Sequence, residues 1–188
     1  MPTLVTRTSA RDRILDTATA LFYADGIRGV GIDRIIAEAG VAKATFYHHF
    51  PTKDALVCAY LTGMHDREVA ALASVPAGTD PGELVLFIFD ALGELACGPG
   101  FRGCAFVNAA VEYPDPASAV RAVVADHRRW FARVLRDQLA AAGHPAPETT
   151  ARMLVTLRDG VVVGAQLDDP ALVRATLRES VTALIGPR

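Results

Sequence analysis

The sequence has 188 residues, of which 51% are hydrophobic and 21% charged, with a formal net charge of −2 at pH 7. This composition excludes a disordered chain, and the small negative charge excludes a protein that coats nucleic acid through bulk basicity. The longest apolar stretch, residues 84–96, is interrupted by two acidic residues and is too short to cross a bilayer, so no membrane partner is expected.

The cysteines and the start of the chain indicate the compartment. The three cysteines show no paired framework, which is typical of a reducing environment. The first residues carry charged side chains, from Arg7 to Arg13, and no apolar signal region. We therefore expect a cytoplasmic protein.

Capping signals mark several helix starts. Ser9 precedes Asp12 by three positions, as in a capping box. Asp-Pro pairs beginning at residues 80, 115 and 169 each fit an N-cap followed by proline in the first turn. No segment alternates apolar and polar residues for long, so no strand is expected. The sequence predicts an all-α fold of about nine helices, over 9–25, 32–39, 43–49, 53–74, 81–96, 104–112, 116–142, 148–167 and 170–185.

Residues 31–56 are the most informative segment. They predict two short helices around a glycine turn, then a third helix beginning at Lys53. In the second helix Phe46 and Phe50 are four residues apart and would both point inward. The remaining side chains would form an outward polar face: Lys43, Ala44, Thr45, Tyr47 and His48, with His49 at its boundary.

This polar face has the chemistry of a DNA-reading surface. Lysine can reach phosphate or guanine, and threonine and tyrosine hydroxyls can bond phosphate oxygens. Lys43 and Lys53, the only lysines of the chain, bracket the helix, and Lys53 would lie where free helix N–H groups favour an anion. We expect double-stranded DNA as the partner, with a flexible arm around Arg7 reaching the backbone. Spacing alone also permits an ordinary helical hairpin with a solvated face.

The segment GIDRIIAEAGVAKATFYHHFPTKDAL resembles the DNA-binding signature of the TetR family of transcriptional regulators. The likeness covers about residues 9–60. Gly31 stands where the family usually has a Ser or Thr cap that touches phosphate, and Ala42 where a serine is common, so side chain 31 is expected to contribute no phosphate contact. The matching positions are Gly40-Val41, Lys43, Thr45-Phe46-Tyr47, His49-Phe50 and Lys53-Asp54-Ala55-Leu56.

The resemblance implies a homodimeric repressor that binds a palindromic operator and releases it when a small-molecule effector enters the C-terminal domain. It implies a helix-turn-helix DNA-binding domain over 1–52 and a ligand-binding and dimerisation domain over 53–188. Dimerisation would use the last two helices, although intrachain packing would give the same apolar faces. The first 60 residues carry seven basic and six acidic side chains, so one copy alone should bind DNA weakly.

The C-terminal part contains enough aliphatic and aromatic side chains to enclose a largely apolar effector. The helix over 81–96 is apolar on nearly every side and is expected to be buried all round. A lone core histidine explains His127 equally well, and Glu112 could instead pair with Arg102 or Arg121. The candidate ligand-binding residues are Phe87, Phe101, Cys104, Asn108, Glu112, His127 and Phe131.

Other chemistries find little support. Adjacent helical side chains such as His48 and His49 point about a hundred degrees apart, so they cannot share a metal. No nucleophile–base–orienter pattern occurs, so we expect no enzyme, no catalytic residue and no cofactor. Cys97 and Cys104 flank a Gly-Pro-Gly turn and could approach each other, but buried thiols are the default. A small-molecule carrier, or an enzyme with a helical N-terminus that does not bind DNA, is the alternative function.

Overall fold

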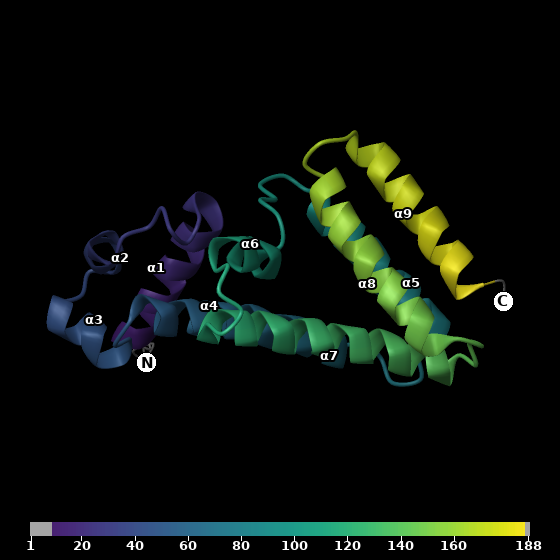
Figure 1. Cartoon of the computed structure of the whole chain (residues 1–188), viewed down its shortest axis with the longest axis horizontal. Coiled ribbons are helices and arrows are strands. Elements are labelled where there is room, and N and C mark those ends of the chain that lie inside the picture. The colour runs from purple at the N-terminus through teal and green to yellow at the C-terminus, as the bar shows by residue number, and fades with distance from the viewer. Residues whose placement is uncertain (1–8, 187–188) are drawn as a thin grey trace, which may run out of the picture. The chain divides into compact units, whose positions relative to one another are not determined.

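Figure 1 shows the computed structural model of the chain, which describes residues 9–186. Within that range the structure contains nine α-helices and no strand, which confirms the all-α prediction. No helix of this range is both long and apolar enough to span a membrane. The helices are α1 Ala10–Asp25, α2 Ile32–Ala39, α3 Lys43–His49, α4 Lys53–Ala73, α5 Pro81–Ala96, α6 Ala105–Glu112, α7 Ala119–Ala141, α8 Pro147–Gly164 and α9 Pro170–Ile185.

Side-chain caps start three of the helices where the sequence predicts them. Ser9 Oγ accepts a hydrogen bond from the Asp12 backbone N–H at 3.1 Å. Asp80 Oδ1 accepts from the Glu83 N–H at 2.9 Å, and Asp169 Oδ1 accepts from the Ala171 N–H at 2.9 Å. Each cap satisfies a backbone donor that has no partner inside its helix.

The Asp115-Pro116 pair does not start a helix, so the prediction that this helix begins at residue 116 was wrong. Asp115 Oδ1 accepts a hydrogen bond from the Ala117 N–H at 2.9 Å, two residues further on, which closes a turn. Helix α7 begins later, at Ala119, where Ser118 Oγ accepts from the Arg121 N–H at 3.2 Å. The serine has taken the capping role that the sequence analysis gave to the aspartate.

The chain forms two compact units, and α4 and α7 contribute residues to both. The N-terminal unit contains the described residues up to Val69 together with Ala105–Val124. The C-terminal unit contains Ala70–Cys104 and the described residues from Ala125 onward. Because Ala105–Val124 belongs to the N-terminal unit, α6 lies in the same unit as α1–α3, although more than fifty residues separate it from α3 in sequence.

The core of the N-terminal unit is built from the apolar faces of α1 to α4. Phe22 of α1 and Tyr60 of α4 are both almost fully buried, with ring centroids 5.8 Å apart. Ile35 of α2 and Phe46 of α3 are fully buried. Each such side chain contributes about 1.5–3 kcal/mol by leaving water, so α2 and α3 are held by their buried faces rather than by length.

In the C-terminal unit α5, α8 and α9 pack against one another, as Figure 1 shows. Gly93 permits the close approach of α5 to α9, because a Cβ at this position would lie 3.2 Å from Leu177 Cδ2. The prediction that α5 is buried all round was wrong: Phe87 is 59% and Leu95 66% exposed in the single chain. Only one face of α5, which includes Phe89, enters the core.

Candidate nucleic-acid interface

The turn between α2 and α3 depends on Gly40. Its backbone is left-handed, with φ 62° and ψ 45°, a conformation that costs residues with a Cβ about 1–2 kcal/mol. The N–H of Gly40 donates to the Ala37 carbonyl and that of Val41 to the Ile36 carbonyl, each at 3.3 Å. These bonds close α2 and fix the direction in which α3 begins.

Helix α3 has two chemically different faces, as the sequence predicts. Phe46 is fully buried and the adjacent C-cap residue Phe50 is 3% exposed, so both anchor the helix to the unit. Tyr47 is 40% exposed although its ring meets the edge of Phe46 with a centroid separation of 5.3 Å. The other predicted DNA contacts of this helix are the exposed Lys43, Ala44 and His48 and the half-buried Thr45 and His49.

The first turns of α2 and α3 carry no side-chain cap. Gly31 and Ala42 are the N-cap residues, and neither accepts a side-chain hydrogen bond from its helix. The N–H groups at the start of α2 therefore keep their capacity to bind an oxygen from outside the chain, and helix N-termini attract phosphate.

The two lysines differ in their environments. Lys43 Nζ lies 3.6 Å from Asp33 Oδ1, but the two side chains are 68% and 89% exposed, so this ion pair is weak and can yield to a phosphate. Lys53 is half-buried in the first turn of α4, with Nζ 5.9 Å from the centroid of the Phe22 ring. Burial lowers the pKa of Lys53, and the negative charges of Glu112 and Asp54 oppose that effect.

Two arginines of the N-terminal unit contact other groups of the chain. Arg34 binds Glu38 at 2.8 Å and Asp25 at 2.7 Å, and these hydrogen bonds raise its pKa. The guanidinium carbon of Arg11 lies 5.4 Å from the centroid of the Phe50 ring. The predicted arm at Arg7 lies outside the described residues.

The end of α6 holds the N-terminal unit together in a way that the sequence analysis missed. The two carboxylate oxygens of Glu112 accept the backbone N–H groups of Ile27 and Arg28, at 2.9 and 2.5 Å. The adjacent Tyr113 donates its hydroxyl to Asp54 Oδ1 at 2.8 Å, in the first turn of α4. Burial, and then this hydrogen bond, raise the pKa of Tyr113. We call these two residues the α6 clamp.

The candidate ligand residues fall into both units. Asn108 and Glu112 belong to the N-terminal unit, and the other five belong to the C-terminal unit. There His127 and Phe131 are buried on α7, Phe101 and Cys104 are partly buried, and Phe87 is exposed. The role of these residues in effector binding remains a prediction.

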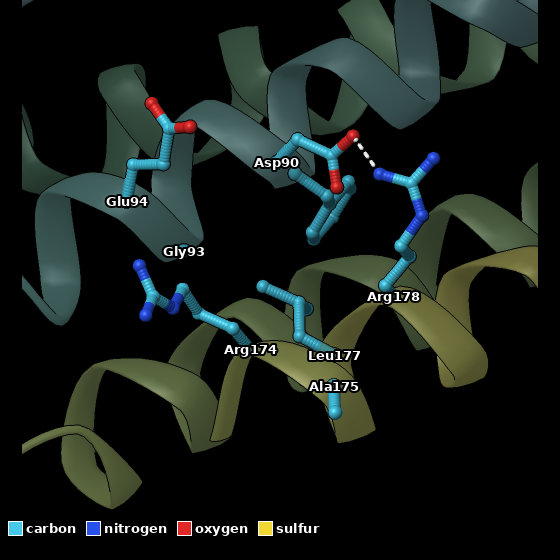
Figure 2. A pocket seen from close by; sticks show the side chains of 8 residues that line it. Asp90, Gly93, Glu94, Arg174, Ala175, Leu177 and Arg178 are labelled. Atoms are coloured by element: carbon cyan, nitrogen blue, oxygen red, sulfur yellow. Dashed lines mark hydrogen bonds and ion pairs between the residues drawn. The ribbon is translucent and has the colours of Figure 1, made fainter. Parts of the chain in front are cut away.

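An open groove lies between α5 and α9, with a volume of about 310 Å³ (Figure 2). An ion pair between Asp90 and Arg178 lies on one side of it, as the dashed line in Figure 2 marks. None of the candidate ligand residues lines this groove. Among the residues that the structure describes, no three His, Cys, Asp or Glu side chains gather in a way that could hold a metal ion.

Comparison with known proteins matches both ends of the chain. Residues 14–60 match the model of bacterial regulatory proteins of the tetR family, and residues 115–187 match a tetracyclin repressor-like C-terminal domain. The crystal structure of SCO4454, a TetR-family transcriptional regulator from Streptomyces coelicolor, is 42% identical, with 94% of each chain covered and a TM-score of 0.87. The transcriptional regulator LmrA of Bacillus subtilis is 27% identical over 93% of this chain and 91% of LmrA.

A further relative has been solved with a ligand. The crystal structure of the multidrug binding protein EbrR complexed with malachite green is 27% identical, covers 96% of this chain and 100% of EbrR, and has a TM-score of 0.75. The two short helices around Gly40 and the polar face of α3 define a helix-turn-helix DNA-binding protein. The chain belongs to the TetR family of transcriptional regulators.

Proposed function

We propose that this regulator is a cytoplasmic homodimeric repressor, which binds a palindromic operator and is released by a small-molecule effector. Residues 1–52 form the DNA-binding domain, to which Lys53 adds a phosphate contact, and residues 53–188 bind the effector and form the dimer. The observation that carries the proposal is the division of α3 into a buried aromatic face and an exposed polar one. A solvated face that served only solubility would not need an exposed tyrosine held against a buried ring, as Tyr47 is held against Phe46.

DNA recognition follows from this division. Helix α3 enters the major groove, where Lys43, Thr45 and Tyr47 reach base edges, with Ala44, His48 and His49 beside them. Lys53 binds a phosphate, and the uncapped N–H groups of α2 bind another. In a dimer, two such helices occupy successive major grooves about 34–36 Å apart.

The dimer forms through α8 and α9. Met153, Val163 and Leu167 are at least half exposed, and they follow one another at helical spacing along α8 and just beyond its end. Gly160 lies between the first two, and a Cβ there would meet no atom of the chain within 4 Å, so a second helix has room to approach. Leu172, 63% exposed, adds an apolar contact from the start of α9.

The α6 clamp transmits the state of the effector site. Glu112 holds the loop between α1 and α2, and Tyr113 holds the first turn of α4, so a movement of α6 changes the support of both. An effector that binds more tightly to the conformation with α6 displaced lowers operator affinity, and the reduction is limited by the difference between its affinities for the two conformations. The ligand-bound structure of the relative EbrR supports an effector for this chain as well.

Selection of bound fragments from a random DNA pool tests the proposed function. Recovery of a palindrome with half-sites one helical turn apart supports it, and enrichment of no sequence at micromolar protein refutes it. Lys53→Ala should weaken binding about equally for all sequences and reduce the salt slope by about one, whereas Lys43→Ala should change the preferred half-site. Arg133→Ala, which removes an exposed cation of α7, is the matched control and should change neither.

Sedimentation equilibrium tests the dimer. Val163→Glu places a charge on the proposed interface and should give a monomer that no longer binds the operator tightly. Leu95→Glu is the matched control, because Leu95 is also an exposed apolar residue but lies on α5. A dimer that persists in Val163→Glu and dissociates in Leu95→Glu would move the interface to α5.

A further inference from the structure

Arg158 of α8 is a buried cation in the C-terminal unit. The residue is 8% exposed. Its Nη2 donates a hydrogen bond to Cys104 Sγ at 3.2 Å, and its guanidinium carbon lies 5.2 Å from the centroid of the Phe131 ring. A carboxylate oxygen of the neighbouring Asp159 lies 3.5 Å from Nη1.

These contacts satisfy the guanidinium poorly. It is always charged and offers five N–H donors, whereas a thiol sulfur is a weak acceptor. Asp159 binds Arg128 Nη2 at 2.7 Å, and its buried Oδ1 makes no hydrogen bond. A buried charge is normally paired and hydrogen-bonded, because desolvation otherwise makes it unfavourable. The fold therefore keeps a buried cation whose neighbouring carboxylate oxygen, that of Asp159 at 3.5 Å, lies beyond normal hydrogen-bond distance.

Phe131, whose ring faces the Arg158 guanidinium, belongs to a group of aromatic side chains on α7. Phe131 and Trp130 of α7 have ring centroids 6.4 Å apart, and His127, one turn earlier and 3% exposed, lies 5.6 Å from Trp130. Cys104, which contacts Arg158, lies at the end of the segment between α5 and α6. A guanidinium fork matches a carboxylate with two parallel hydrogen bonds, and aromatic walls match an apolar body.

We propose that Arg158 binds the carboxylate of an otherwise apolar effector. The two carboxylate oxygens accept from the guanidinium and replace the Cys104 thiol there, while Phe131 and Trp130 contact the apolar body. This inference rests on the proposed function, because it names the chemical class of the effector. It also explains why a cation occupies a place where a methionine would pack at lower cost.

Pairs of acids and their neutral amides test this assignment in the full-length protein. Suitable probes are naphthalene-2-carboxylate, indole-3-acetate and decanoate, each with its amide, titrated by calorimetry. At least one acid should bind ten-fold or more tightly than its amide. Arg158→Met should abolish that preference, and Arg158→Lys, which keeps the charge but not the fork, should reduce it. Arg178→Met removes an exposed cation of α9 and should leave the preference unchanged.

Two results would overturn the inference. They are equal affinity for acid and amide in every pair, and a preference that survives Arg158→Met. Because Arg158→Lys retains the charge, it keeps the test valid if the methionine variant does not fold.

The assignment and the proposed function can fail separately. A preference for acids that depends on Arg158, without a palindrome from the random DNA pool, would refute the regulator and keep the ligand class. A recovered palindrome with no preference for acids would support the regulator and refute the proposed ligand class. If iodoacetamide labels Cys104 rapidly at neutral pH and Arg158→Met slows the labelling, while no acid is preferred, the cation serves a thiolate and the inference is wrong.

Discussion

Replacement of Glu112 by glutamine tests the α6 clamp directly. The substitution keeps the size of the side chain, but one of the two acceptor oxygens becomes an NH₂ group that faces a backbone N–H. One charge-assisted hydrogen bond is lost, and the remaining one becomes neutral. Hydrogen bonds to charged groups contribute about 1.5–3 kcal/mol, so we expect Glu112→Gln to lower the free energy of unfolding by about that amount.

For a chain of this size, such a loss corresponds to a fall of about 3–12 °C in melting temperature. Thermal unfolding followed by circular dichroism measures it. Hydrogen exchange should show faster exchange at the amides of Ile27 and Arg28 than in the wild type. Glu179→Gln, at an exposed position of α9, is the control and should leave both measurements unchanged. Unaltered exchange at residues 27 and 28 in Glu112→Gln would refute the clamp, whatever the melting temperature.

Three further predictions follow from other contacts. Tyr113→Phe removes the hydrogen bond to Asp54 and should cost about 1 kcal/mol in urea denaturation, and no change would show that solvent replaces the bond. Burial lowers the pKa of Lys53 from the usual 10.5, so just below pH 10.5 the folded chain binds fewer protons at Lys53 than the unfolded chain does. The contribution of Lys53 to the free energy of unfolding therefore rises with pH in this window. Operator affinity, measured by fluorescence anisotropy, should accordingly fall at alkaline pH in the wild type and less in Lys53→Arg; an identical fall in both would exclude Lys53. Gly93→Leu should lose about 1–3 kcal/mol by crowding Leu177, whereas Gly63→Leu, with no atom within 4 Å of an added Cβ, should not.

The features that the sequence predicted correctly are local ones. The caps at Ser9, Asp80 and Asp169 act within three residues, and the orientation of Phe46 and Phe50 follows from one helical turn. A capping residue can be misidentified when a neighbour competes for the same donors, as happened at Asp115.

The features that the sequence could not predict depend on distant partners. Glu112 binds backbone amides 85 and 84 positions away, and no local pattern distinguishes it from an exposed helix-end glutamate. Arg158 was not singled out because an arginine in an amphipathic helix normally faces solvent. The exposure of Phe87 and Leu95 depends on which face of α5 meets the other helices, and an all-apolar helix does not show that face in its sequence.

Gly31 and Ala42 provide no side-chain caps, so the proposed binding of DNA should stabilise the helix-turn-helix itself. In the free protein, water must solvate the amides that a serine or threonine would have satisfied, so the beginnings of α2 and α3 are prone to fraying. In the proposed complex, phosphate oxygens would supply these missing acceptors. Operator DNA should therefore slow amide exchange at the starts of α2 and α3 more than the burial of these amides by DNA alone would. The entropy lost in ordering the two helix starts would then reduce the free energy of operator binding.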